Sequence, residues 1–197
     1  MGRVVMSAVM SLDGFIADPH DRVGPMFDWY GNGDVATAPG DPERTFHVSR
    51  ASADYMNETW PQVGAAVIGR HLFDLTNGWH GRPAAGDAVF VVTHHAPTDW
   101  PFPDAPFTFV TDGVRSAVEQ AKVFAGDRDV SISAGNVGAQ AFSAGLVDMV
   151  DIDLVPVVLG AGKRFFGDVV TDQTVLENPR VVEGDRVIHL RYPVRAG

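Results

Sequence analysis

The chain has 197 residues, of which 45% are hydrophobic and 20% charged, so we expect residues 1–197 to form a single globular domain. Its formal net charge is −10 and it lacks Lys- or Arg-rich runs, which argues against nucleic acid as a partner, and no apolar run is long enough to predict a membrane span. Cysteine is absent, which removes thiolate chemistry and favours a cytoplasmic location.

Short apolar runs alternate with helix-like stretches along the chain. Strands are expected at 3–10, 65–69, 88–93, 107–111, 130–134 and 149–159, and helices near 47–60, 70–76, 113–125 and 136–145. This alternation is typical of an α/β domain with a mostly parallel central sheet flanked by helices. Two β-rich runs around Glu183-Gly184-Asp185 predict an antiparallel C-terminal hairpin. The segment 18–46 lacks periodicity and is expected to be a long loop.

Two carboxylates interrupt the apolar run at 149–159. Asp151 and Asp153 alternate with Val150, Ile152 and Leu154, which predicts a strand with one face that is wet or covered by a partner. Pro156 indicates a bulge or a sheet edge.

The stretch "SISAGNVGAQAFSAGLVD" at 131–148 combines a strand end, a glycine-bearing turn and a helix. Asn136 begins the helix, whose free N–H groups and dipole favour an anion. Gly135 and Gly138 leave room for a phosphate group against the backbone. The alternative is a tight turn without a ligand, because the full GxGxxG pattern is absent.

Two other strand ends repeat this arrangement. Gly69 and Arg70 open the helix at 70–76, where a guanidinium suits phosphate oxygens, although an ion pair with Asp74 is an equal alternative. The strand at 88–93 ends in Thr93-His94. Because parallel strands end at the same sheet edge, three such junctions favour an anion site there.

Other motifs point to less specific roles. No two of the seven histidines show H-x-x-x-H spacing, so no metal site is predicted. The segment "GAGKRFFG" at 160–167 lacks P-loop spacing and is interpreted as a structural loop. Phe27, Trp29 and Tyr30 are expected either to cover a flat substrate or to pack in the core.

The motifs "SLDGFIA" (11–17), "VIGRHLFD" (67–74), "VVTH" (91–94), "AGNVGAQAFSAGLVD" (134–148) and "LVPVVLGAGKRFF" (154–166) occur in a characteristic order. Together they resemble the dihydrofolate reductase-like family, specifically relatives of the riboflavin-biosynthesis reductase domain (RibD C-terminal), from residue 3 to about 170. The resemblance implies an NADPH-dependent reductase, similar to 5-amino-6-(5-phosphoribosylamino)uracil reductase, acting on a small heterocyclic or carbonyl substrate. It also implies a homodimer.

The same resemblance assigns cofactor-binding residues. Gly69, Arg70 and His71 match the segment that holds the pyrophosphate and the adenosine-side phosphate, and Thr93 and His94 match the strand end that reads the 2′-phosphate. The turn Gly135, Asn136, Val137 and Gly138 matches the opposite side of the pyrophosphate, and Ile16 and Ala17 match the segment beside the nicotinamide.

Several positions depart from the family pattern. Leu72 replaces a common threonine, Ala134 replaces the first glycine of a Gly-Gly pair, and His94 stands where arginine is frequent. NADPH is therefore the expected cofactor, with NADH not excluded. The acidic segment after "SLDG" also differs from the Arg-containing region of the riboflavin enzymes.

Hydride transfer to a C=N or C=O bond also requires a proton source. Asp13 is the catalytic candidate near the substrate, and Asp28 is a second choice; the alternative for Asp13 is a turn-forming role before Gly14. A different reading of the whole chain is a nucleotide-binding or dimeric scaffold module without turnover.

Overall fold

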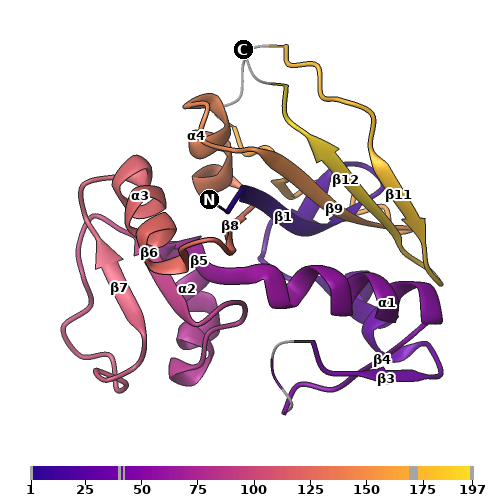
Figure 1. The fold of residues 1–197 in the computed structure, drawn as a ribbon, viewed down its shortest axis with the longest axis horizontal. Coiled ribbons are helices and arrows are strands. Elements are labelled where there is room, and N and C mark those ends of the chain that lie inside the picture. Colours follow the sequence, from indigo (N-terminus) through magenta and orange to yellow (C-terminus); the bar gives the residue numbers. More distant parts are fainter. Residues whose placement is uncertain (1, 40, 42, 169–172, 196–197) are drawn as a thin grey trace.

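The computed structural model describes residues 2–39, 41, 43–168 and 173–195. An eight-stranded sheet in the order β11-β12-β9-β1-β8-β5-β6-β7 forms its centre (Figure 1). The strands are β1 (Val4–Ser11), β5 (Val63–Gly69), β6 (Ala88–Val92), β7 (Phe107–Val110), β8 (Asp129–Ser133), β9 (Met149–Val155), β11 (Arg180–Glu183) and β12 (Ile188–Pro193).

Strands β9 to β7 pair in parallel, whereas β12 and β11 continue the sheet antiparallel. This arrangement confirms the predicted α/β class and the antiparallel C-terminal pair. Strand β9 ends at Val155, directly before Pro156, but it lies inside the sheet between β1 and β12 rather than at an edge.

The helices are α1 (Arg50–Thr59), α2 (Arg70–Thr76), α3 (Val114–Ala125) and α4 (Asn136–Ser143), with short turns η1 (Gly24–Gly31), η2 (Trp60–Gln62) and η3 (Asn77–Gly81). Helix α1 begins at an N-cap, because the Ser49 side chain accepts a hydrogen bond from the Ser52 N–H group. Among the described residues, no helix has the length and apolar character that crossing a membrane requires.

One face of the sheet is fully packed. Alternate strand residues, among them Met6, Val67, Ile132 and Val150, are buried beneath apolar residues of α3 and α4. Because side chains alternate along a strand, their neighbours point to the opposite face.

The opposite face is covered only at its two sides. Trp29 of η1 and Met56 of α1 pack near β1, β9 and β12, and Phe73 of α2 packs over β5 and β6. Figure 1 shows α1 running below β1, β9 and β12, with the hairpin of β3 (Val35–Thr37) and β4 (Phe46–Val48) beneath it. The middle of this face lies between the two apolar clusters.

The prediction of a structureless segment at 18–46 is wrong in part. It contains η1, β3 and the start of β4, and the side chains of Met26 and Trp29 are buried. Short elements of this kind escape detection because their apolar residues show neither helical nor strand periodicity. Trp29 therefore belongs to the core, whereas Phe27 is partly exposed.

Candidate functional site at the carboxyl edge of the sheet

A cavity of about 920 Å³ occupies the middle of the half-covered sheet face. Its floor is formed by side chains of three neighbouring strands: Ser7, Val9, Ser131, Ser133, Asp151 and Asp153. Aromatic rings line one wall: Phe27, Tyr30, Phe46, Tyr55 and Trp60. Concave sites of this kind, at the carboxyl ends of parallel strands, are where open α/β sheets bind ligands.

Two of the predicted strand-to-helix junctions meet at the carboxyl edge of this cavity. A Cβ atom on Gly69, the N-cap of α2, would lie 2.9 Å from Val137 Cγ2 in the first turn of α4. Only a residue without a side chain allows the two helix starts to approach this closely. Gly69, His71, Gly135, Asn136 and Val137 all line the cavity.

The turn before α4 requires its first glycine for conformational reasons. Gly135 has a φ of 90°, and a Cβ atom there would lie 3.3 Å from Ile16 Cδ1. Its N–H group donates to the Phe165 carbonyl at 2.7 Å, which fixes the turn. The N–H groups of the first α4 turn follow this residue and have no partner within the helix, so this end favours an anion.

Gly138 has a different role from Gly135. It is buried and does not line the cavity, and a Cβ atom there would lie 2.6 Å from the Ser133 carbonyl oxygen and 3.2 Å from Met6. Gly138 therefore permits close packing of α4 on β8 and β1, and direct contact with a phosphate group stays a prediction.

Arg70 lies at the same edge, next to the cavity rather than in its lining. Its Nε donates to Asp74 Oδ1 at 2.7 Å, and its Nη1 donates to the His95 carbonyl at 2.6 Å and to Thr93 Oγ1 at 3.4 Å. The alternative ion pair with Asp74 is thus present, and the guanidinium also joins α2 to the end of β6. Arg70, Thr93 and His94 do not line the cavity, Thr93 is only 8% exposed, and phosphate binding by these residues stays a prediction.

A histidine and a lysine side chain line the mouth of the cavity. His71 Nε2 lies 2.9 Å from Asp21 Oδ1, and Lys163 Nζ lies 3.7 Å from the same oxygen. The hydrogen bond with His71, aided by the charge of Lys163, holds the pKa of Asp21 below its usual range. One carboxylate therefore sits between two groups that are suited to a phosphate group.

The predicted nicotinamide segment forms a strand, β2 (Phe15–Ala17), that pairs with β10 (Lys163–Arg164). Ile16 and Ala17 both line the cavity beside Gly135. A Cβ atom on Gly162 would lie 1.9 Å from the Ala17 carbonyl oxygen, so this glycine lets the two strands approach. The segment 160–167 is therefore structural, as predicted, and it also presents Lys163 to the cavity.

Asp13 is occupied by other contacts. Its carboxylate accepts hydrogen bonds from Ser11 Oγ at 2.7 Å and from the N–H groups of Leu159 and Gly160 at 3.1 and 2.7 Å. The Ser11 hydrogen bond, with the backbone donors, keeps the pKa of Asp13 below its usual range, and the side chain does not line the cavity. These contacts argue against Asp13 as proton donor, because they stabilise the ionised carboxylate; Asp28 is exposed and also lies outside the cavity lining.

Sequence reasoning did not assign a role to the acidic floor of the cavity. Arg191 Nε lies 3.1 Å from Asp151 Oδ1, an ion pair without hydrogen-bond geometry, and burial raises the pKa of Asp151 to about 6. Nearby, Asp129 pairs with Arg3 at 3.0 Å. The alternation at 149–153 was the available signal, but it did not show that the wet face is the floor of a cavity.

Within the part of the chain that the structure describes, no three His, Asp or Glu side chains gather in a way that suits a metal ion. The polar groups of the site are instead backbone N–H groups, isolated cations and carboxylates on the floor. This arrangement is that of an α/β protein whose glycine-lined turns suit a phosphate-bearing ligand.

Comparison with known proteins specifies this class further. The model of the RibD C-terminal domain matches residues 3–190, and the chain belongs to this family. This finding confirms the resemblance described above. A search of curated protein sequences returned no match.

Solved structures share the fold. A putative riboflavin biosynthesis protein from Shewanella sp. PV-4 is 19% identical, with 98% of this chain and 99% of that chain covered and a TM-score of 0.68. A pyrimidine reductase-like protein from Corynebacterium diphtheriae is 16% identical, with coverages of 100% and 93% and a TM-score of 0.62. A diaminohydroxyphosphoribosylaminopyrimidine deaminase/5-amino-6-(5-phosphoribosylamino)uracil reductase from Thermotoga maritima is 15% identical; 98% of this chain matches 57% of that one, with a TM-score of 0.61.

Proposed function

We propose that this protein is a reductase that transfers hydride from a nicotinamide dinucleotide to a small planar heterocyclic or carbonyl substrate. NADPH is the expected cofactor, and NADH is not excluded. Membership of the RibD C-terminal domain family supports this proposal, as do the names of the reductase from Thermotoga maritima and the pyrimidine reductase-like protein from Corynebacterium diphtheriae.

The observation that carries the proposal is the contact between the two glycine-bearing junctions beside a large cavity. Gly69 and Gly135 line the cavity without a side chain, which suits a ligand linker held against bare backbone. Lys163 adds positive charge at the same mouth, and His71 adds a ring nitrogen that can form a hydrogen bond. The residues present therefore fit a dinucleotide with its pyrophosphate at the α2 and α4 starts.

Each part of the site has a distinct task. The bound nicotinamide would supply the hydride. Ile16 and Ala17 would orient its ring, the helix starts and cations would hold the phosphates, and the aromatic wall would exclude water from the substrate.

Titration of the purified protein with NADPH and with NADH, followed by nicotinamide fluorescence, tests this function. We expect NADPH to bind more tightly and to be oxidised when a suitable pterin, pyrimidine or carbonyl compound is added. Binding without oxidation across such a panel favours the module without turnover, and no binding of either nucleotide at millimolar concentration rejects the dinucleotide site.

Arg70→Ala tests the predicted adenosine-side phosphate contact. Loss of a charge-assisted hydrogen bond is expected to weaken NADPH binding by about 1.5–3 kcal/mol. Arg50→Ala is the matched control, because Arg50 also opens a helix and lies 3.9 Å from an aspartate four residues later, Asp54. Equal NADPH affinity of the two variants removes Arg70 from the site.

Two further expectations have separate grounds. We propose that the protein forms a homodimer, as the family resemblance implies, and that it resides in the cytoplasm, which the absence of cysteine favours. Light scattering after size-exclusion chromatography measures the first, and cell fractionation measures the second. A monomer at micromolar concentration rejects the dimer.

A further inference from the structure

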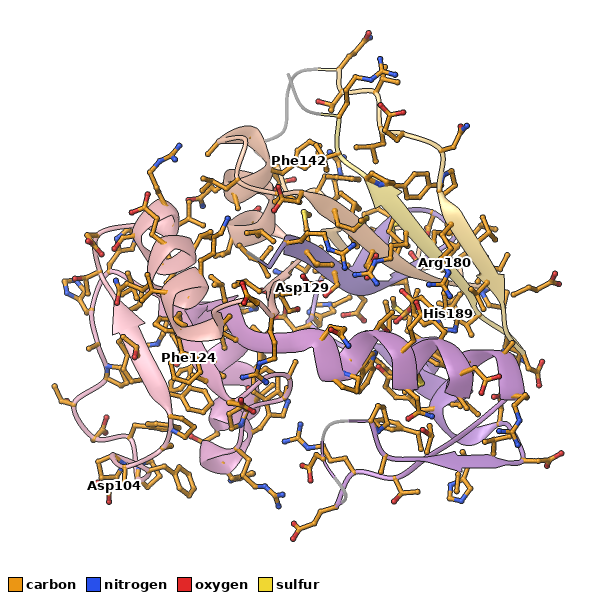
Figure 2. All side chains as sticks on the ribbon, viewed as in Figure 1. Asp104, Phe124, Asp129, Phe142, Arg180 and His189 are labelled. Atoms are coloured by element: carbon orange, nitrogen blue, oxygen red, sulfur yellow. The ribbon has the colours of Figure 1, made fainter. Side chains whose placement is uncertain are left out.

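A chain of hydrogen bonds runs from α1 to a carboxylate on the cavity floor. The Ser49 hydroxyl donates to Ser52 Oγ at 3.2 Å, Ser52 Oγ lies 2.9 Å from His189 Nε2, and His189 Nδ1 lies 2.6 Å from Asp153 Oδ1. In Figure 2, His189 and Arg180 lie where the β11–β12 pair faces α1. Ser52 of α1 thus contacts His189 of β12, which in turn contacts Asp153 of β9.

The histidine in this chain is held rigidly. His189 has no exposed side-chain surface, its ring stacks on Tyr55 with centroids 4.4 Å apart, and the Trp29 ring meets it edge-on at 5.3 Å. Ser52 is only 1% exposed, so no substrate can reach its hydroxyl as a nucleophile. The Ser-His-Asp arrangement therefore orients Asp153 and does not act as a hydrolytic triad.

The contact with His189 determines which carboxyl oxygen of Asp153 is available to a ligand. Because Ser49 donates to Ser52, the Ser52 hydroxyl proton is free to point at His189 Nε2, and the other ring nitrogen, Nδ1, faces Asp153. The 2.6 Å contact of Nδ1 with Asp153 Oδ1 fixes the orientation of this carboxyl group. Among the described residues, Asp153 Oδ2 makes no observed hydrogen bond, and the side chain is 22% exposed at the cavity.

Strand register places this carboxylate beside the proposed cofactor edge. Ser7 of β1 pairs with Ser133 of β8 on one side, and Val9, two residues further along β1, pairs with Asp153 of β9 on the other. Asp153 therefore lies two residues closer to the carboxyl edge of the sheet than Ser133. The turn at Gly135 follows Ser133 along the chain. The rings of Tyr30 and Tyr55 line the same cavity.

We propose that Asp153 is a substrate-specificity residue that binds the N–H edge of a planar, protonatable nitrogen heterocycle with an amidine-like pair of donors. This inference rests on the proposed function, because it takes the substrate to bind in this cavity. A carboxylate held in one orientation beside aromatic rings selects a flat ring with adjacent N–H donors over one with acceptors at that edge. Ser52 and His189 are positioning residues for this contact.

Calorimetric titration with 2,4-diaminopyrimidine in the presence of saturating NADPH tests the proposal. The wild-type protein is expected to bind this probe, and Asp153→Asn is expected to bind it at least about tenfold more weakly, since a charge-assisted hydrogen bond is lost. Asp54→Asn removes the same charge from an exposed site on α1 and should bind as the wild type does. Equal affinities of wild type and Asp153→Asn, or no binding by the wild type, overturn the assignment.

A second measurement needs no variant and so remains decisive if Asp153→Asn does not fold. The wild-type protein should bind 2,4-dimethylpyrimidine, which has the same shape but no N–H donors, at least about tenfold more weakly than 2,4-diaminopyrimidine. Similar affinities overturn the assignment. NADPH titration of the same samples is read separately, so loss of the reductase proposal and loss of the Asp153 assignment give different results.

Discussion

The two faces of the central sheet are built from the same strands and differ in what covers them. On the α3–α4 face, Met6, Ile132 and Val150 are fully buried, whereas on the other face Ser7, Ser131 and Asp151 line a cavity. The first face stabilises the fold by excluding water from apolar surface. The second keeps polar groups, some of them poorly paired, beside the edge where the proposed cofactor binds. The comparison shows that alternate residues of one strand can have different tasks: those on one face stabilise the fold, and those on the other line the candidate site.

Adjacent substitutions in β8 provide the strongest test of this difference. Ile132→Ala, on the packed face, is expected to lower the free energy of unfolding by about 2–5 kcal/mol because it leaves a cavity in a dense core. Ser131→Ala, on the cavity face, should change it by about 1 kcal/mol or less, since it removes only the contact with Ser7 Oγ at 3.2 Å. Denaturant unfolding measures both values, and similar losses would contradict the separation of the two faces.

The pH dependence of stability tests the free-energy cost of burying the Asp151 carboxylate on the cavity face. Because the pKa of Asp151 is raised to about 6 from an ordinary 3.8, the folded protein retains a proton that the unfolded chain has released between these values. The contribution of Asp151 to stability, about 1–3 kcal/mol, therefore falls as pH rises from about 4 to 6. Asp151→Asn should flatten this fall in unfolding experiments at a series of pH values.

Asp54→Asn is the control for that series, because it removes one exposed carboxylate from α1. If the free energy of unfolding depends on pH in the same way for the wild type and Asp151→Asn, ionisation of the buried Asp151 does not destabilise the fold.

The smallest effect is expected from a substitution at the mouth of the cavity, measured as a change in NADPH affinity. Asp21→Asn removes the carboxylate that lies between His71 and Lys163, so NADPH should bind a few-fold more tightly. The gain should shrink at high salt because solvent-exposed charges are screened. Weaker binding by Asp21→Asn would instead show that Asp21 orients His71 for the cofactor.

Much of the fold was predictable because its signals are local. The strands expected at 3–10, 65–69 and 130–134 agree closely with the bounds of β1, β5 and β8. The helices expected after the last two agree with α2 and α4. The short elements within 18–46 were missed, since their stability comes from packing of Met26 and Trp29 rather than from periodicity.

The glycine-bearing junctions were also visible in the sequence, because parallel strands must end at one edge. Their different roles were not. Gly135 and Gly138 have the same residue type, yet one faces the cavity and the other a strand carbonyl, and this depends on which atoms the fold places within 3 Å.

The sequence by itself determined the class of fold and the edge that carries the candidate site, because strand and helix periodicity and glycine-bearing turns are encoded by residues near one another. The order of five motifs along the chain indicated the family by resemblance. Only the tertiary structure decided that Asp13 is bound by backbone donors and that Asp153 is held by Ser52 and His189. Those partners lie 146 and 147 residues from Asp13, and 36 residues separate Asp153 from His189. The chemistry of a carboxylate depends on the donors around it, and contacts between such distant residues are fixed only when the strands pair and the core closes.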